Sequence, residues 1–487
     1  MTLTLRSRLL FLAGLLAFQL AWIVALPAFT AMDEFDHAYR AGSVAAGHWQ
    51  AGEQPATIGR GVLLLVPEDL PRSARDVCLA LRYTGWDNCI ARTEPNAAGE
   101  VTIASAAGNY NPTYYWWAGG LAAPFEGDAA LFVMRTATVL LSNLLLFGAL
   151  SLNRHSLSGW ALAGFAVVLT PTITYATAVA APNGVGFAGA ILLWTALLRL
   201  PTFTGTSVRG PILGVVAGAA VVMCTHATGP LWVLAIAVCG APLWWPRFTL
   251  LLRHHPRVTA ATFVLLSVFL VACILWIATS GTNDPRQEDE DLGPVPIALL
   301  LKLPLFLALQ SVATLQFRNQ AAPTLVYVLG LLAMLAFLGL TWRRSTRRAR
   351  AAMGLTALAA LIAPLAATLI AYPLVGNAWQ ARYGFPLYVG LFLVSLEASR
   401  GMKPRRAVGF GVLVLAGALQ ALTLWSVLNA EFGGASLATA DVLRYVLITL
   451  LSLVGIGMWL RAFSAGTCHV VVLPAVGVET GDATVRA

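Results

Sequence analysis

The chain has 487 residues, of which 58% are hydrophobic and 11% are charged, and its formal net charge is +9. Soluble proteins carry roughly a quarter charged residues, so this composition excludes an ordinary soluble protein. The positive charge does not indicate a nucleic-acid partner, because most of the basic residues lie in short loops between apolar runs. Those runs have the length of about twenty residues that crosses a bilayer, which predicts an all-α polytopic membrane protein surrounded by membrane lipids.

The first apolar run, 9–28, follows Arg6 and Arg8. It is longer than the core of a cleaved signal peptide, which favours a retained first transmembrane helix over a removed leader. Later runs bring the predicted total to about twelve transmembrane helices. The remaining predicted spans are 129–151, 158–179, 184–200, 211–227, 230–246, 258–279, 323–342, 351–373, 383–399, 407–428 and 441–460.

The loops between these spans carry their basic residues on alternate sides. One set of loops holds the run RRSTRRAR at 343–350, whereas the other set holds nearly all the acidic residues. By the positive-inside rule, the basic loops and both ends of the chain lie in the cytoplasm. The segment 295–318 would break this alternation if it crossed the membrane. Because it contains Lys302 and Pro304 near its middle, we predict a re-entrant or interfacial helix on the outer side.

This topology divides the chain into six parts. They are a first transmembrane helix (1–28), a large extracytoplasmic loop with an acidic cluster and short helices (29–128), transmembrane helices 2–7 (129–279), a second extracytoplasmic loop with the re-entrant or interfacial helix (280–322), transmembrane helices 8–12 (323–461) and a cytoplasmic tail (462–487).

An acidic cluster directly follows the first span, with Asp33, Glu34, Asp36 and His37 close together. Carboxylates are costly to place near a membrane, so such a cluster is more often functional than a simple helix end, although both interpretations stay open. Asp33 can act as a general base on a hydroxyl acceptor. Glu34 can orient that acceptor or, with Asp33, hold a divalent cation such as Mg²⁺ or Mn²⁺; no other cofactor is indicated. His37 shares a helical face with Asp33 and is a catalytic acid or a partner of that carboxylate.

Two further segments on the outer side contain candidate binding residues. Before the second span, Tyr110, Pro112, Tyr114 and Tyr115 form either an interfacial aromatic belt or a wall that binds a sugar or a lipid. The cluster begins outside the apolar run, which favours the binding wall.

Arg382 and Tyr383 lie at the outer mouth of the tenth predicted span, where the positive-inside rule expects no arginine. Arg382 either reaches toward lipid headgroups or binds a phosphate with its planar fork of donors. His226, in an outer turn, is a weaker candidate for substrate binding.

The cysteines fall into two groups. Cys78 and Cys89 share the first outer loop, where oxidation is permitted, so we predict a disulfide between them; two free buried thiols are the alternative. Cys224, Cys239 and Cys273 lie in apolar runs, and we interpret them as small buried hydrophobic residues.

Four short motifs together resemble a known family. They are Asp-Glu-x-x-His at 33–37, Tyr-x-Pro-x-Tyr-Tyr at 110–115, a Pro-Asn turn at 182–183 and Arg-Tyr-x-x-Pro at 382–386. They are similar to motifs of the bacterial membrane proteins catalogued as domain of unknown function 2142, which are placed among the GT-C glycosyltransferases. The chain departs from the family at Ala31 and Met32, where a Pro-Pro pair is common.

The resemblance implies a fold, a reaction and roles for these residues. It implies a GT-C-like architecture in a bacterial inner membrane, with Asp33 and Glu34 as the catalytic carboxylates and His37 as the histidine that follows them. It implies a polyprenyl-phosphate-linked sugar as donor, with Arg382 on its phosphate. The acceptor would be a glycan or lipid of the cell envelope, reached by a single inverting displacement in which Asp33 is the general base.

Two other functions compete with this one. A transporter or flippase of lipid-linked sugars would also have many spans, but transporters usually place ionisable residues inside their spans, which here are almost free of them. The third candidate is a structural or scaffold membrane protein, and the long loop that carries acidic residues argues against it.

Overall fold

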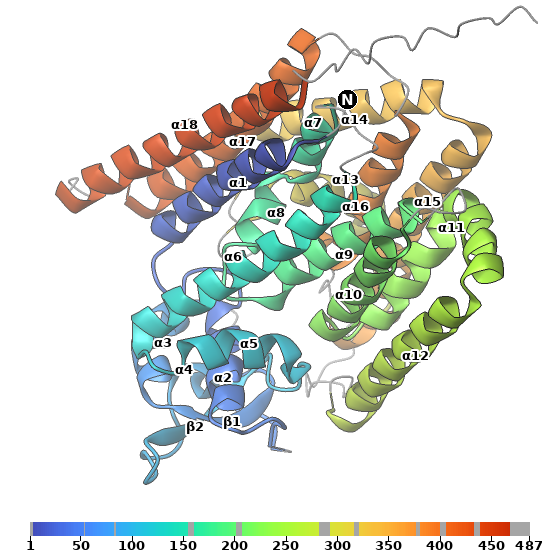
Figure 1. Ribbon diagram of the computed structural model, residues 1–487. Coiled ribbons are helices and arrows are strands. Elements are labelled where there is room, and N and C mark those ends of the chain that lie inside the picture. The colour runs from blue at the N-terminus through green and yellow to red at the C-terminus, as the bar shows by residue number, and fades with distance from the viewer. Residues whose placement is uncertain are drawn as a thin grey trace, which may run out of the picture.

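The structure is a computed structural model that describes residues 3–52, 54–81, 84–153, 160–200, 207–281, 293–315, 321–375, 380–399, 406–432 and 439–467. It is a bundle of helices with a small lobe at one end, which lies at the lower left of Figure 1. The predicted class, an all-α membrane protein, is therefore confirmed for the bundle.

Eight described helices are long and apolar enough to cross a membrane. They are α1 (Leu5–Ala25), α6 (Gly127–Leu152), α11 (Gly229–His254), α12 (Pro256–Thr279), α14 (Thr324–Arg344), α15 (Arg347–Val375), α17 (Arg406–Phe432) and α18 (Thr439–Thr467). Each occupies a predicted span.

Three shorter helices occupy further predicted spans: α9 (Pro182–Leu198), α10 (Arg209–Thr225) and α16 (Ala381–Ala398). A helix of 17 residues is about 26 Å long, slightly less than the hydrocarbon thickness. The side chains of α9 are almost all buried, so this helix is a core element whose length need not match the lipid. The length and composition of the described helices therefore identify eight spans, fewer than the twelve predicted.

The predicted span over 158–179 is not a single helix. Its described part forms α7 (Trp160–Val168) and α8 (Pro171–Ala176), separated by Leu169 and Thr170. Pro171 has no N–H to continue the helical hydrogen bonds, and Thr170 caps the new helix. The amide of Gln420 in α17 donates to the carbonyl of Leu169 at 2.8 Å and to Thr174 at 2.9 Å. The first of these bonds satisfies a backbone carbonyl that the break would leave unpaired inside the bundle.

The predicted re-entrant or interfacial segment contains one short helix, α13 (Ile297–Val312), with Pro304 inside it. It is not among the eight long helices. It packs against α8, α14, α15 and α16, and residues 316–318 of the predicted segment lie outside the described ranges.

The first and last helices of the described chain lie side by side, blue against red in Figure 1. Phe11 of α1 stacks on Trp459 of α18, with ring centroids 5.3 Å apart. The indole N–H of Trp459 donates to the carbonyl of Phe11 at 3.0 Å. The first and last described helices of the chain are thus packed together in the bundle.

The lobe at the lower left comprises α2–α5 and two strands, and we call it the loop lobe. Its elements are α2 (Glu34–Ala45), β1 (Val62–Pro67), α3 (Asp69–Ala80), α4 (Trp86–Cys89), β2 (Glu100–Ser105) and α5 (Pro112–Ala122). The short helices agree with the prediction, but the sheet was not predicted. The strands pair antiparallel, with Val62 opposite Ser105 and Pro67 opposite Glu100.

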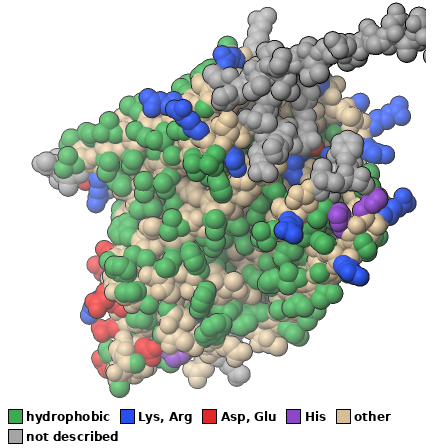
Figure 2. All heavy atoms as spheres, in the orientation of Figure 1, with side chains coloured by type: hydrophobic (Ala, Val, Ile, Leu, Met, Phe, Trp, Pro, Cys, Tyr) green, Lys and Arg blue, Asp and Glu red, His purple; other side chains and the backbone are tan. Residues whose placement is uncertain are grey.

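Charged side chains are segregated along the molecule. Figure 2 shows acidic side chains gathered over the loop lobe and basic ones mainly along the opposite edge, with hydrophobic side chains between them. This pattern is the one that the positive-inside rule describes.

The structure joins Cys78 at the end of α3 to Cys89 of α4 in a disulfide, with Cα atoms 5.4 Å apart. Replacing both residues by serine should destabilise the loop lobe by roughly 2–3 kcal/mol, because the bond restricts the unfolded chain. Limited proteolysis of the purified protein measures this as faster cleavage within 54–105. Cys468→Ser, outside the described residues, is the matched control. Unchanged proteolysis of the double variant would contradict the prediction.

Candidate functional site

Asp33 stands at the junction between α1 and the loop lobe, directly before α2. Its backbone is left-handed, with φ of 54°, a conformation that residues other than glycine, asparagine and aspartate rarely adopt. Two contacts with the bundle hold this turn. The N–H of Met32 donates to the hydroxyl of Tyr175 in α8 at 3.0 Å, and the Glu34 carboxylate binds Arg135 of α6. These contacts fix the direction in which the Asp33 side chain leaves the backbone.

Glu34 belongs to the frame around the site. It is completely buried, and Arg135 donates to its two oxygens at 2.8 and 2.7 Å. The N–H of Ala180 donates to the same carboxylate at 3.0 Å. Arg135 also donates to the carbonyls of Leu26 and Pro27, where the first span ends, at 2.8 Å each. These contacts favour a structural role for Glu34 over the predicted orienting or metal-binding role.

The Asp33 carboxylate lies between two arginines from distant parts of the chain. Arg382, in the first turn of α16, donates to Oδ2 of Asp33 at 2.7 Å. Arg60, in the loop before β1, has its Nη2 3.9 Å from Oδ1 of Asp33 and 3.2 Å from Asp36. The sequence predicts Asp33 and Arg382 as separate candidates, and the structure brings them together across 349 residues.

Arg382 is held by its neighbours but retains donor capacity. The N–H of Ala381 donates to Oε1 of Gln310 in α13 at 2.8 Å, which fixes the start of α16. The guanidinium lies over the ring of Tyr383, 5.2 Å from its centroid, and donates to its hydroxyl at 3.2 Å. Its Nε is buried and has no hydrogen-bond partner within the described ranges. A guanidinium with a buried, unsatisfied N–H is suited to binding an incoming anion.

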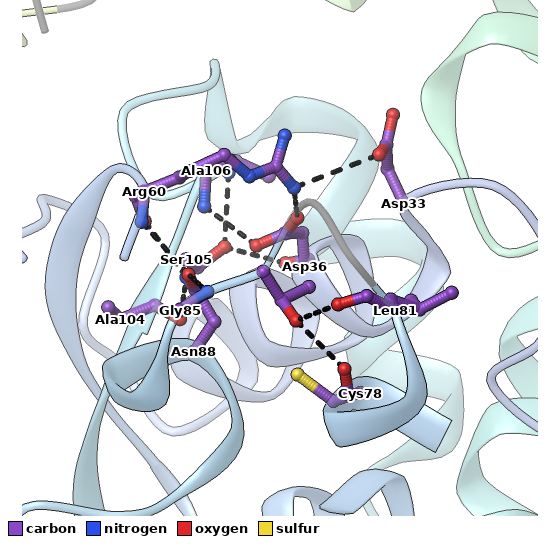
Figure 3. A network of polar contacts seen from close by, with 12 residues as sticks. Asp33, Asp36, Arg60, Cys78, Leu81, Gly85, Asn88, Ala104, Ser105 and Ala106 are labelled. Carbon is purple, nitrogen blue, oxygen red and sulfur yellow. Dashed lines mark hydrogen bonds and ion pairs between the residues drawn. The ribbon is translucent and has the colours of Figure 1, made fainter. Parts of the chain in front are cut away.

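Arg60 is the residue of this site that the sequence analysis does not identify. Asn88 accepts a hydrogen bond from its N–H and donates to its carbonyl, each at 2.9 Å (Figure 3). Gly61 has φ of 82°, and a Cβ there would lie 2.0 Å from the carbonyl oxygen of Ser105, so only glycine fits. The disulfide at Cys89 adjoins this clamp. A Gly-Arg-Gly sequence inside a polar loop is the signal that could have marked Arg60.

Asp36 ties the start of α2 to the sheet. The N–H of Ala106 donates to its Oδ1 at 2.7 Å, and Arg60 binds its other oxygen (Figure 3). Ser105 donates from its hydroxyl to the Asp36 carbonyl at 2.9 Å. Asp36 therefore orients Arg60 toward Asp33.

An arc of rings continues the site from Arg382. In order of contact the arc consists of Tyr383, His226, Tyr110, His37 and Tyr115. The first three contacts have ring centroids 5.1, 6.3 and 5.8 Å apart, and Nδ1 of His37 lies 2.8 Å from the hydroxyl of Tyr115. His37 follows Asp33 by one helical turn, and Tyr383 adjoins Arg382, which binds Asp33, so the arc is linked to Asp33 at both of these residues. Five predicted candidates are thus brought together.

Both histidines of the arc are neutral near neutral pH. Burial lowers the pKa of His37 from 6.5 to about 4, although Asp33 opposes this shift. Burial also lowers the pKa of His226 to about 4, and Arg382 adds to the effect. Nδ1 of His226 accepts from the N–H of Thr228 at 3.2 Å, so the neutral ring carries its proton on Nε2. Neutral imidazoles can hydrogen-bond substrate hydroxyl groups without adding charge.

A small pocket adjoins the arc. It is lined in part by Tyr110, Asn111 and His226. Cys273 and Trp276 of α12 form its opposite wall. The pocket gives the arc an open side next to the membrane helices.

Two predicted binding residues have local structural roles. Pro112 occupies the first turn of α5, where Asn111 caps the helix by accepting from the N–H of Thr113 at 3.0 Å. Tyr114 points toward α6, with its hydroxyl 2.7 Å from that of Thr138, and its ring packs edge-on against Tyr115. Pro112 therefore begins the helix that carries Tyr115, and Tyr114 packs against the ring of Tyr115.

The described part of the chain contains no group of three or more His, Cys, Asp or Glu side chains placed to hold a metal ion. The predicted pair of metal ligands also diverges, because Glu34 faces Arg135 whereas Asp33 faces Arg382. This donor set does not fit a shared divalent cation. Arg60 and Arg382 bring positive charge to the same place.

The chain was compared with known protein families, curated proteins and solved structures. A family model described as "Predicted membrane protein (DUF2142)" matches residues 16–391. ArnT from Cupriavidus metallidurans is similar in its apo state, with 15% identity and a TM-score of 0.47, and bound to undecaprenyl phosphate, with 14% identity and a TM-score of 0.44. Each match covers 94% of this chain and 76% of the other. No curated protein matches the chain significantly. The family match includes every residue placed around Asp33.

Proposed function

Because its residues 16–391 match the family model, the chain belongs to the DUF2142 family of predicted membrane proteins, and we propose that it is a GT-C-type glycosyltransferase. It transfers a sugar from a polyprenyl-phosphate donor to a glycan or lipid acceptor of the cell envelope. The reaction takes place on the outer side of a bacterial inner membrane. The observation that carries the proposal is the 2.7 Å contact between Asp33 and Arg382 at the junction of bundle and loop lobe.

The position of this pair suits a substrate that is half lipid and half sugar. Asp33 follows the end of the first span by a few residues, and Arg382 begins α16. A phosphate attached to a polyprenyl chain stays at the membrane surface, at the depth of these two residues. The loop lobe then covers the sugar, whereas the bundle faces the lipid.

In the proposed reaction Asp33 accepts the proton of the acceptor hydroxyl as its oxygen attacks the anomeric carbon. The new glycosidic bond forms while the bond from that carbon to the phosphate oxygen breaks. Polyprenyl phosphate leaves with the electron pair, and the configuration inverts. Arg382 and Arg60 balance the charge that develops on the leaving phosphate.

The remaining residues of the arc would hold the sugar. Neutral His37 and His226 and the hydroxyl of Tyr383 can exchange hydrogen bonds with its hydroxyl groups, and the face of Tyr110 can pack against its ring. Glu34 acts through Arg135 by fixing the turn that carries Asp33. With two arginines in place, the mechanism needs no divalent cation.

The direct test uses the purified protein and a panel of polyprenyl-phosphate-linked sugars with envelope extracts as acceptors. Consumption of a donor together with a newly glycosylated acceptor supports the proposal. Glycan analysis of cells with and without the protein then identifies the product. An unchanged envelope glycan profile together with no donor consumption would contradict the proposal.

Arg382→Ala should weaken binding of undecaprenyl phosphate, used as probe, by at least about tenfold, because a charge-assisted hydrogen bond contributes about 1.5–3 kcal/mol. Native mass spectrometry of the protein in detergent measures the bound lipid. Arg343→Ala, at the far end of α14, removes the same charge elsewhere and should leave binding unchanged. Equal binding by both variants would remove Arg382 from the phosphate site.

We further propose that the loop lobe faces outward and that both chain ends are cytoplasmic. A single cysteine at exposed Ala98 should react with a membrane-impermeant maleimide in intact cells. A single cysteine at exposed Thr346, between α14 and α15, should react only after permeabilisation. Both are introduced into a background without the native free cysteines. Labelling of the Thr346 position in intact cells would reverse the orientation and move the site to the cytoplasm.

One observation favours a second candidate, a transporter or flippase of lipid-linked sugars. The interrupted α7–α8 pair resembles the broken helices that line transporter sites. Transporters usually have such helices in pairs, related by an internal repeat. Movement of a lipid-linked sugar across vesicles without cleavage of the sugar–phosphate bond would favour this candidate over the transferase.

A further inference from the structure

Two cysteines interpreted from the sequence as separate buried residues lie next to each other. Cys224 is near the end of α10 and Cys273 is in α12, and their sulfur atoms are 3.6 Å apart. Both are free thiols, Cys224 half-buried and Cys273 buried. A disulfide has its sulfur atoms about 2.05 Å apart, so an approach of about 1.5 Å would join them.

The pair lies at the same end of the protein as the loop lobe. The indole N–H of Trp276, one turn after Cys273, donates to the carbonyl of Asn109 at 3.1 Å. Cys273 and Trp276 also line the pocket whose other wall is Tyr110. The compartment that oxidises Cys78 and Cys89 in the loop lobe is therefore also the compartment closest to Cys224 and Cys273.

Access and freedom of movement both favour reaction. The pocket leads to Cys273, and Cys224 is partly exposed. Helix α12 is the least buried of the eight long helices, because only 6% of its apolar 18-residue stretch is buried. It packs mainly against α10 and α11. A helix attached on one side can shift by the small distance that a disulfide requires.

We propose that Cys224 and Cys273 form a second, reversible disulfide that fastens α12 to α10 at the wall of the pocket. The oxidant is a disulfide, either of a small thiol or of a protein dithiol oxidase. A thiolate of the pair attacks it, giving a mixed disulfide, and the second thiolate displaces the oxidant's sulfur. The pair loses two protons and two electrons, and the oxidant leaves as two thiols.

The test treats the full-length protein in detergent with oxidised glutathione as probe and then alkylates it under denaturing conditions. Mass spectrometry of non-reduced peptides should show loss of alkylation at both cysteines and a peptide cross-linked between α10 and α12. Reduction should restore alkylation. Cys239, which lies in α11 with Leu355 as its sulfur's hydrogen-bond partner, should stay alkylated throughout.

Three results of the alkylation experiment would overturn the proposal. They are full alkylation of both cysteines, glutathione attached to one cysteine without a cross-link, or a cross-link to Cys239. In Cys273→Ser the cross-linked peptide should disappear, which assigns the partner.

Amide hydrogen exchange at the outer end of α12 should slow on oxidation, because the new bond holds α12 against α10. Unchanged exchange in the cross-linked protein would refute the proposed fastening of α12.

Discussion

Asp33→Asn should lower the rate of sugar transfer by at least about a hundredfold, the scale of general-base catalysis. Asparagine keeps the size and polarity of the side chain but cannot take the acceptor proton. It also tolerates the left-handed backbone at this position, so the turn before α2 should survive. The rate is measured with a donor that the wild-type protein consumes, and undecaprenyl phosphate binding is measured in parallel.

Asp128→Asn is the matched control, because Asp128 is an exposed carboxylate at the start of α6. Its transfer rate should equal that of the wild type. If Asp33→Asn transfers sugar at a near-normal rate, Asp33 is not the base. The same change at Asp36 then tests the other carboxylate that Arg60 binds.

Arg135→Ala should destabilise the protein by about 3–5 kcal/mol, because it leaves the Glu34 carboxylate buried without its partner. The variant also loses the donors to the carbonyls at the end of the first span. The loss should appear as a lower thermal unfolding midpoint in detergent and as reduced folded yield. Arg257→Ala removes an exposed arginine at the start of α12 and should change neither quantity.

Glu34→Gln separates the two roles considered for Glu34. A structural Glu34 predicts that this variant loses stability together with activity, and that Glu34→Gln combined with Arg135→Met regains part of the stability. A variant that unfolds like the wild type but transfers sugar a hundredfold more slowly would return Glu34 to catalysis.

The helices of the bundle could be predicted because each is encoded locally by a run of apolar residues. The division between α7 and α8 was missed although Thr170 and Pro171 mark it locally. The contact that stabilises it could not be predicted, since the carbonyl freed at Leu169 is satisfied by Gln420, 251 residues away. The strands were missed for a similar reason. The run Val62–Pro67 is only six residues long, and its partner strand follows after two helices.

The candidate site shows the same limit. Asp33, His37 and Arg382 could be named because their residue types are unusual at those places in the sequence. The arrangement of the site could not be predicted, because it depends on contacts between separate parts of the chain, such as that of Asn88 with Arg60. The sequence predicts a functional role for Glu34 beside Asp33. The contact with Arg135, 101 residues later, indicates a structural role instead.

The packing of α1 against α18 also sets an order of events during synthesis. Phe11 enters the membrane first, and its partner Trp459 follows 448 residues later. At a synthesis rate of about 5–20 residues per second, α1 waits about 20–90 s for this contact. Arg382 is likewise made long after Asp33, so the newly made loop lobe can fold and be oxidised before the Asp33 carboxylate meets Arg382. The nascent chain therefore has no complete site until α16, which carries Arg382, has been made.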